Sequence, residues 1–404
     1  MDDKILIREL SLKNLLSFGG QGQTLRLQPL NVLIGPNGSG KSNLIEAISI
    51  LQAAPRDLAA PIREGGGVSE WLWKGDSHSP AAELNTEVLY PAGHGPLRYK
   101  LCFGMSGQRM ELIDEAVENV FRQSDSDDVY FYYRFQRGHP VLNIRKIGID
   151  LGKTGPYYER RLQREDLQPN QSVLSQRKDP EQYPEITYLG NVFSKIKIYR
   201  EWDFGRYTKP RMPQKADLPE DFLEENAGNL GLVLNDLEHR AGLKQQLLEK
   251  LRQFYGEVAD ITTRIQGGTV QVFLHEEGIN LPIPATRLSD GTLRYLSLLS
   301  ILIHPTPPPL ICIEEPELGL HPDILPTIAQ MLIEASKRTQ LVVTTHSDIL
   351  VSALQEVSES IIVCGRTKHG TVMQRLDNEK LADWLEKYPL GELWRMGELG
   401  GTRW

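Results

Sequence analysis

Little in this 404-residue sequence points to the oxidising exterior of a cell or to a membrane. It holds three cysteines, Cys102, Cys312 and Cys364, whose spacing suggests neither a disulfide framework nor a metal site. No apolar run approaches the ~20 residues of a membrane span. The first residues also lack the charged and apolar regions of a signal peptide. We therefore expect a cytoplasmic protein with buried free thiols and no contact with a membrane.

An excess of positive charge is also missing. The net charge of −8 argues against a globally basic nucleic-acid binder. The charge is uneven, however, because residues 134–215 hold 17 Lys and Arg against 9 Asp and Glu. Tyr157, Tyr158, Tyr199 and Trp202 lie among these cations and could stack on bases. The segment is predicted either to face DNA or another phosphate-rich partner, or to be a solvated, salt-bridged insertion, and the sequence leaves both open.

The chain has no internal repeat and no sustained heptad pattern, so we expect no long coiled coil. The 247 residues from Ser42 to Ser289 suit a compact inserted lobe. Within it, residues 221–259 have a helical pattern of leucines, and residues 261–284 are typical of a β-hairpin that turns at residues 276–278.

What the sequence does contain is a phosphate-binding loop. Residues 35–42 read GPNGSGKS, and they follow an apolar run and precede a helical pattern. This is the strand–loop–helix context that the motif needs. Its glycines let backbone N–H groups surround phosphate oxygens, and the helix N-terminus adds the positive end of its dipole. Lys41 can reach the β- and γ-phosphates, and Ser42 can bind Mg²⁺.

A second segment carries paired carboxylates, the first of which, Glu314, lies 279 residues after Gly35. Residues 310–316 read LICIEEP, a buried-strand pattern that ends in Glu314 and Glu315. One carboxylate can hold the metal and the other can activate water. Together with the phosphate loop, this segment predicts a nucleotide-binding protein.

Two further segments lie near these in the sequence. Residues 287–292, RLSDGT, place Ser289 and Gly291 at the start of a helical run, which suits an anion-binding corner. Alone, such a corner is an ordinary capped helix. Residues 341–347, LVVTTHS, are a buried strand ending in His346, one predicted helix (324–337) after the carboxylates. We expect His346 beside the same phosphate, although a histidine at a strand end is usually structural.

The order of these segments resembles that of the ABC-type ATPases, and in particular the SMC/RecF-like branch. The ending LGELW at residues 390–394, with Gly400 and Gly401, looks like a family of stand-alone predicted AAA/RecF-like ATPases. The resemblance is specific over residues 1–48 and 285–365 and weak between them. The motifs that carry it are LKNLLSF at residues 12–18, GPNGSGKSNLIEA at 35–47, LSDG at 288–291, EEPELGLHP at 314–322 and THS at 345–347.

The resemblance implies an α/β fold: a P-loop NTPase built as an ABC-type ATPase head, with a mixed sheet and an inserted α/β lobe. The chain would be one domain, residues 1–404, with a core lobe of about 1–130 and 300–404 and an inserted signature lobe of about 131–299. The implied function is Mg²⁺-dependent ATP hydrolysis coupled to head-to-tail dimerisation, in DNA repair or anti-phage defence. The 58 residues after His346 leave no room for a fused nuclease, so a separately encoded nuclease or other effector is expected.

The resemblance also assigns roles to individual residues. Glu315 would orient or deprotonate the attacking water, and His346 would contact the γ-phosphate. Ser289 and Gly291 would bind the γ-phosphate of ATP held by the other subunit. Metal ligands would be Ser42, Glu314 and, as the candidate for the linking glutamine, Gln176, for which the alternative is a surface glutamine beside Arg177 and Lys178. The loop residues that would wrap the triphosphate are Asn37, Gly38, Ser39, Gly40, Lys41, Ser42 and Asn43.

Three departures from the family pattern stand out. Glu314 occupies a position where most ABC ATPases have aspartate, Asp290 replaces a glycine of the transporter signature, and the glutamine that normally links the metal to the helical lobe is hard to place. The turn after Glu317 also lacks the aspartate that many ABC ATPases have there. Two other functions remain open. One is an ATP-binding switch or scaffold that hydrolyses ATP slowly. The other is the nucleotide-binding subunit of a transporter, which the EEPE segment and the long insertion disfavour.

Overall fold

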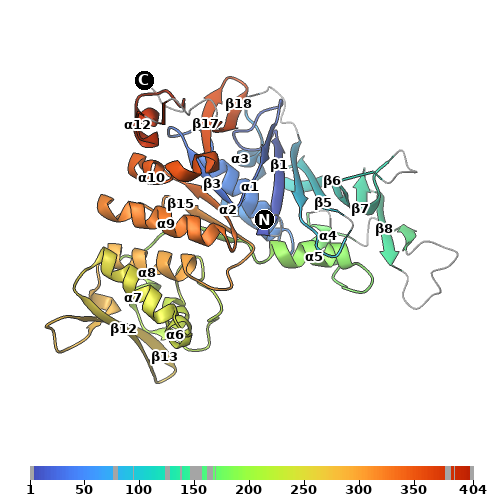
Figure 1. Ribbon diagram of the computed structural model, residues 1–404. Helices are drawn as coiled ribbons and strands as arrows, with labels where there is room; N and C mark the ends of the chain where they lie inside the picture. The colour runs from blue at the N-terminus through green and yellow to red at the C-terminus, as the bar shows by residue number, and fades with distance from the viewer. Residues whose placement is uncertain are drawn as a thin grey trace.

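Three β-sheets organise the part of the chain that the computed structural model describes (Figure 1). The structure describes residues 4–75, 81–93, 95–122, 128–136, 139–145, 157–161, 167–168, 170–377, 384–385 and 387–400. In Figure 1 a six-stranded sheet lies at the centre, an eight-stranded sheet to the right, and a small third sheet at the lower left.

The eight-stranded sheet is antiparallel and buries one face. In one of its strands Leu97, Tyr99, Leu101 and Phe103 are buried, while the side chains between them are partly exposed. This alternation is typical of an antiparallel sheet with one covered face. In sheet order its strands are β2 (Gln23–Arg26), β1 (Ile7–Lys13), β4 (Ala82–Val88), β5 (Leu97–Ser106), β6 (Arg109–Asn119), β7 (Phe131–Gln136), β8 (His139–Arg145) and β9 (Tyr157–Arg161).

The six-stranded sheet is mostly parallel, and three neighbouring strands are buried nearly throughout. Such continuous apolar runs mark parallel strands that are covered on both faces. Its last strand pairs antiparallel and forms an edge. In sheet order the strands are β10 (Lys197–Tyr199), β15 (Leu310–Glu314), β16 (Gln340–Thr344), β3 (Leu30–Ile34), β17 (Ile361–Thr367) and β18 (Gly370–Arg375).

Helix α1 (Lys41–Ala53) fills the space between these two sheets. Leu44, Ile45, Ile48 and Leu51 of α1 share one hydrophobic core with inward side chains of both sheets. The opposite face of the six-stranded sheet packs against a second core. That core includes α8 (Asp290–Leu302), α9 (Leu325–Ser336) and α10 (Asp348–Ala353). Shorter helices among the described residues are α2 (Ala60–Glu64), α3 (Val68–Trp71), α4 (Val173–Gln176), α5 (Pro184–Phe193) and α12 (Leu390–Arg395).

Residues 214–302 form a separate layer, which we call the signature lobe. Helices α6 (Leu230–His239) and α7 (Leu243–Phe254) pack on its sheet, and α8 packs on these two helices (Figure 1). The strands are β11 (Gln214–Lys215), β13 (Thr269–Glu276) and β12 (Val258–Gln266), with β14 (Ile283–Pro284) paired to β13.

The structure differs from two sequence expectations in this region. The expected lobe boundary near residue 131 falls inside the eight-stranded sheet, because β7 pairs with β6 and β8 and β9 extend the same sheet. The hairpin turns at Gly267 and Gly268 rather than at residues 276–278, because these two glycines both have positive φ and join β12 to β13. No helix among the described residues is long and apolar enough to span a membrane.

Candidate nucleotide-binding site

The carboxyl edge of the six-stranded sheet brings distant segments together. Strands β15, β16 and β3 are parallel neighbours, so their carboxyl ends lie side by side. The phosphate loop follows β3, Glu314 ends β15, and Thr345 and His346 follow β16. Ligands of open α/β sheets bind at this edge. The sequence motifs, scattered over more than 300 residues, therefore converge on one place.

The phosphate loop has the backbone conformation that an anion cradle needs. Gly35, Gly38 and Gly40 all have positive φ. A Cβ added to Gly40 would lie 2.2 Å from the Thr371 hydroxyl, so a larger residue would not fit there. Helix α1 begins at Lys41 without a side-chain cap. The first N–H groups of α1 are thus available to phosphate oxygens, and the loop suits the phosphates of a nucleoside triphosphate.

Lys41 is held inside this loop. Only 6% of its surface is exposed, and its Nζ donates to the carbonyl oxygens of Gly35 at 2.8 Å and Pro36 at 3.2 Å. Burial lowers the pKa of Lys41, and acidic groups around it, Glu314 and Glu315 among them, oppose that shift. The ammonium group therefore donates to neutral carbonyl oxygens in this structure. Charged phosphate oxygens would accept stronger hydrogen bonds from it.

Ser42 and Glu314 form the pair that a magnesium ion would need. The Ser42 hydroxyl donates to Glu314 Oε2 at 3.1 Å. The described residues contain no cluster of three or more His, Cys, Asp or Glu that could hold a metal. Mg²⁺ commonly binds through one or two protein ligands, with water and substrate phosphates completing its shell. The hydroxyl–carboxylate pair beside the phosphate loop fits that requirement.

Arg200 stands on the other side of Glu314. Its Nε donates to Glu314 Oε1 at 2.8 Å, and a second nitrogen donates to Glu46 Oε1 at 3.2 Å. Burial raises the pKa of Glu46, and the Arg200 guanidinium opposes this. Arg200 therefore holds two carboxylates from different elements beside Ser42. The sequence motifs did not assign a role to Arg200, although it directly follows β10, the parallel neighbour of β15.

Glu315 has an unusual backbone. Its φ is +46°, a left-handed conformation that costs a residue with a Cβ about 1 kcal/mol or more. Its N–H donates to the Thr344 carbonyl at 3.0 Å, which holds that conformation. Its Oε1 lies 3.7 Å from His346 Nε2. Burial and the charge of Lys41 lower the pKa of His346, and Glu315 opposes this shift. In its neutral form the ring can donate one hydrogen bond and accept another.

Glu317 fixes the segment that carries His346. Its Oε1 accepts hydrogen bonds from the Thr345 hydroxyl at 2.8 Å and from the His346 N–H at 2.7 Å. Burial raises the pKa of Glu317. The side chain thus ties the turn after β15 to the end of β16. The sequence signal for it was its place in the EEPE motif, but no role was assigned to it.

The signature corner lies at the start of α8. The Ser289 hydroxyl accepts a hydrogen bond from Thr292 N–H at 3.0 Å, and Ser289 itself is exposed. A Cβ added to Gly291 would lie 3.0 Å from the Gly319 carbonyl, so the corner lies against the turn after Glu317. Among the described hydrogen bonds, none joins Ser289 or Gly291 to the phosphate loop of the same chain.

Gln176, predicted as a metal ligand, is not brought to Ser42 and Glu314. Its side-chain oxygen accepts from Gln168 N–H at 2.8 Å, and its amide nitrogen donates to the Gln171 carbonyl at 2.9 Å. The buried Glu115 carboxylate of β6 anchors the first turn of the same helix, α4, by accepting from Val173 N–H at 2.9 Å. The metal role of Gln176 therefore has no support in this geometry, and Arg200 stands beside Glu314 instead.

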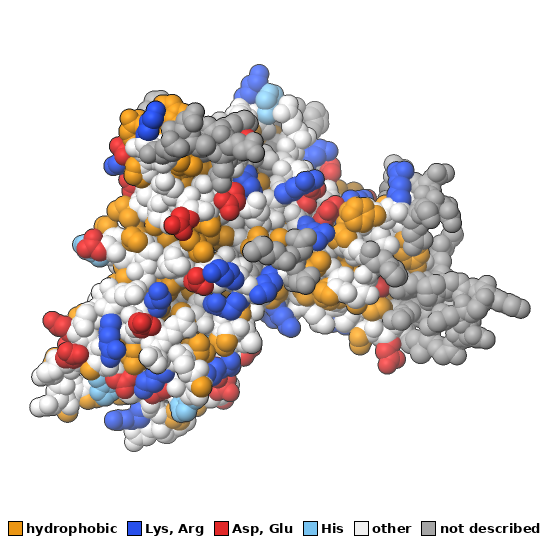
Figure 2. All heavy atoms as spheres, viewed as in Figure 1, with side chains coloured by type: hydrophobic (Ala, Val, Ile, Leu, Met, Phe, Trp, Pro, Cys, Tyr) orange, Lys and Arg blue, Asp and Glu red, His pale blue; other side chains and the backbone are white. Residues whose placement is uncertain are grey.

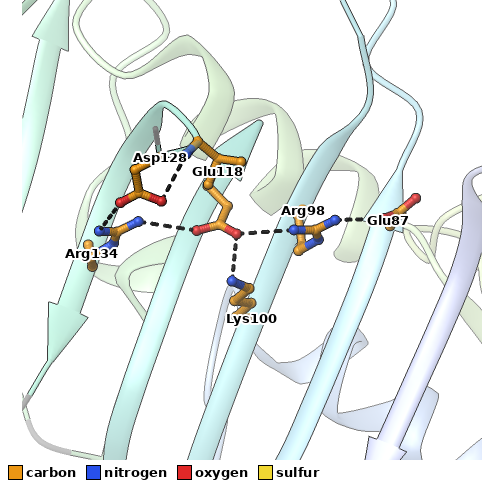
Figure 3. Close-up of polar contacts among 7 residues, drawn as sticks. Glu87, Arg98, Lys100, Glu118, Asp128 and Arg134 are labelled. Atoms are coloured by element: carbon orange, nitrogen blue, oxygen red, sulfur yellow. Dashed lines mark hydrogen bonds and ion pairs between the residues drawn. The ribbon is translucent and has the colours of Figure 1, made fainter. Parts of the chain in front are cut away.

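Three described cations of the basic segment, Arg134, Arg200 and Arg211, pair with acids. Arg134 and two cations of β5, Arg98 and Lys100, converge on Glu118, which is only 1% exposed (Figure 3). Arg134 also pairs with Asp128 at 3.2 Å. On the face shown in Figure 2, Lys and Arg are interspersed with Asp and Glu. The side chains of Tyr157, Tyr158, Arg160 and Arg161, and all of Arg164, lie outside the described residues.

Comparison with known proteins agrees with this architecture. Residues 30–352 match a family described as "AAA domain, putative AbiEii toxin, Type IV TA system". The chain belongs to this family. Among curated proteins, it is 21% identical to the Old nuclease of Escherichia phage P2, over 94% of this chain and 62% of that protein. The chain thus spans less than two thirds of the length of this relative.

Solved structures with the same fold include SMC head domains. One is an SMC head bound to the C-terminal winged-helix domain of ScpA, with a TM-score of 0.55, 14% identity, and coverage of 94% of this chain and 99% of that chain. Another is an SMC head with an extended coiled coil, bound to a ScpA domain derived from Pyrococcus furiosus. Its TM-score is 0.54, with 14% identity and coverage of 95% and 99%. The predicted SMC/RecF-like resemblance and P-loop α/β fold of this AAA-domain protein are confirmed.

Proposed function

We propose that this AAA-domain protein binds ATP with Mg²⁺ at the carboxyl edge of its six-stranded sheet and hydrolyses it in a head-to-tail pair of subunits. The observation that carries the proposal is the pairing of Ser42 with Glu314 at 3.1 Å, directly beside Glu315 and His346. Few other functions require a phosphate loop, a metal-binding pair and a second carboxylate at one sheet edge.

Each residue has a distinct task in this proposal. The N–H groups of the loop hold the phosphates, and the Lys41 ammonium group exchanges its carbonyl partners for phosphate oxygens. Ser42 and Glu314 would hold Mg²⁺, which when bound neutralises charge on the phosphates. Glu315 accepts a proton from the attacking water, and neutral His346 donates a hydrogen bond to the γ-phosphate.

Phosphate release by the purified protein tests the proposal directly. Activity that needs ATP and Mg²⁺, and that rises more than linearly with protein concentration, supports hydrolysis by a pair of subunits. Binding without measurable turnover would favour the switch or scaffold alternative.

The signature corner provides a specific prediction. Ser289→Arg is expected to leave ATP binding to the isolated subunit unchanged, because no hydrogen bond among the described residues joins Ser289 to its own phosphate loop. ATP-driven association and turnover should be lost, because the larger cation fills the corner meant for the γ-phosphate of the other subunit. Sedimentation with ATP and a turnover assay check both halves. Normal hydrolysis by this variant would rule out the use of the corner in trans.

We also propose that the ATPase acts in DNA repair or anti-phage defence with a separately encoded effector. The similarity to a protein named Old nuclease, of which this chain spans 62%, supports a link to nuclease systems. In this proposal ATP-dependent pairing of the heads controls the effector, and the basic segment 134–215 contributes to a DNA-facing surface.

A salt series tests the DNA surface. If the segment contacts duplex phosphates, affinity should fall by about 0.9 log units per log unit of salt for each phosphate neutralised. Changing Arg160, Arg161 and Arg164 to glutamate is then expected to weaken binding and flatten the slope, measured with ATP present. An identical slope in the variant, or no DNA binding at low salt, would leave the segment as a salt-bridged insertion or a surface for a protein partner.

A further inference from the structure

Residues 199–211, which we call the strap, run from the end of β10 to a 3₁₀ turn at Lys209–Arg211. Three aromatic rings stack along it. The Tyr199 and Trp202 centroids are 5.6 Å apart, and those of Trp202 and Phe204 are 5.9 Å apart, with nearly parallel planes. Because these rings pack on one another, the strap is a defined element rather than a loose connection.

One end of the strap holds the carboxylate segment. Arg200 donates to the Glu314 carboxylate at 2.8 Å, and Trp202 Nε1 donates to the Glu314 carbonyl at 3.2 Å. Arg294, from α8, lies 5.3 Å above the Trp202 ring, and its guanidinium is 3.5 Å from the Glu315 carbonyl. The strap therefore contacts both the end of β15 and the helix that carries the signature corner.

The other end of the strap holds the corner itself. Arg211 is only 6% exposed, and its Nε donates to the Phe204 carbonyl at 2.8 Å. The same guanidinium donates to the Leu288 carbonyl and to the Asp290 carboxylate. Leu288 and Asp290 flank Ser289. A buried guanidinium with these partners cannot shift without losing several hydrogen bonds at once.

We propose that Arg211 is a positioning residue that fixes the Ser289 corner relative to Glu314 and Glu315 of the same chain. The strap sets the distance between the two because Arg211 binds the corner and Arg200 and Trp202 bind the carboxylate segment. The consequence for activity rests on the proposed head-to-tail pair. In that pair, the position at which the corner meets the ATP of the other subunit is fixed relative to Glu314 and Glu315 of the corner's own chain.

Hydrogen–deuterium exchange on the full chain tests the positioning role without nucleotide. Arg211→Ala should make the backbone amides of residues 289–293 exchange roughly ten-fold faster, since several buried hydrogen bonds are lost. Exchange in α1 should not change. Arg211→Lys keeps the positive charge but lacks the planar guanidinium group with its several N–H donors. It should therefore give the same faster exchange at residues 289–293 with less effect on the rest of the fold. Arg240→Ala is the control, because Arg240 pairs with Asp236 in the same lobe and does not touch the corner.

Nucleotide affinity separates this inference from the proposed function. Both Arg211 variants should bind ATP within about two-fold of wild type, while turnover falls by roughly ten-fold or more, as expected for a residue outside the nucleotide contacts. Unchanged exchange at residues 289–293 in Arg211→Lys, or a loss of ATP affinity like that of Lys41→Ala, would overturn the positioning role. If wild type itself does not hydrolyse ATP, the proposed function fails, and the exchange result still decides whether Arg211 positions the corner.

Discussion

Replacing Lys41 with alanine is expected to abolish ATP binding or to weaken it by about 100-fold, the effect of losing two charge-assisted hydrogen bonds. Lys41 is the one cation in residues 35–43. Arg200, which is also near, is already engaged with Glu314 and Glu46. No other positive group in the loop can therefore replace the ammonium at the β- and γ-phosphates.

Isothermal titration with ATP and Mg²⁺ measures this effect. Lys74→Ala is a matched control, since Lys74 is an exposed lysine that pairs with Glu70 away from the site. Thermal unfolding of both variants reports separately on the fold, because Lys41 is buried and its loss leaves the Gly35 and Pro36 carbonyl oxygens without this donor. Unchanged ATP affinity in Lys41→Ala would contradict the prediction that residues 35–42 bind the phosphates of ATP.

The segments at the sheet edge could be predicted because each carries its own local signal. The apolar runs of β3, β15 and β16 are long enough to identify buried strands, and each ends in polar residues whose chemistry is specific. Parallel pairing then places the carboxyl ends together. The resemblance to SMC/RecF-like ATPases supplied the order, and the comparison with solved structures confirmed the fold.

Arg200 could not be predicted, because its position depends on a pairing between distant segments. Strand β10 has three residues, too few for a periodic pattern, yet Tyr199 pairs with Ile313 of β15. The next residues along the two strands are Arg200 and Glu314, which therefore meet. Gln176 was chosen from its local sequence instead, and its amide is satisfied by nearby backbone groups.

The hairpin of the signature lobe shows a different difficulty. Two glycine-containing turns compete in residues 258–284, one at Gly267 and Gly268 and one at Gly278, and all three glycines adopt positive φ. The structure uses the first turn for the β12–β13 hairpin and the second to lead into the short β14. Both turns have suitable local chemistry, and the choice depends on which strands share the buried face.

Glu315→Gln is expected to retain ATP binding while lowering turnover by about 10²- to 10⁴-fold, the range for removal of a general base. The amide has nearly the same shape as the carboxylate. The backbone hydrogen bond from residue 315 to Thr344 does not involve the side chain, so the left-handed turn should persist. Glu314 would also keep its contacts with Ser42 and Arg200. ATP should then accumulate in the closed pair, because the pair forms but the water is not activated.

Sedimentation with ATP and Mg²⁺ should therefore show a larger species for Glu315→Gln than for wild type at the same concentration. Glu334→Gln, on the exposed face of α9, is the control and should behave as wild type. Adding Ser289→Arg to Glu315→Gln should abolish the larger species, since the trapped pair needs the signature corner. If Glu315→Gln hydrolyses ATP at a rate near that of wild type, Glu315 is not the base, and Glu314 is the next carboxylate to test.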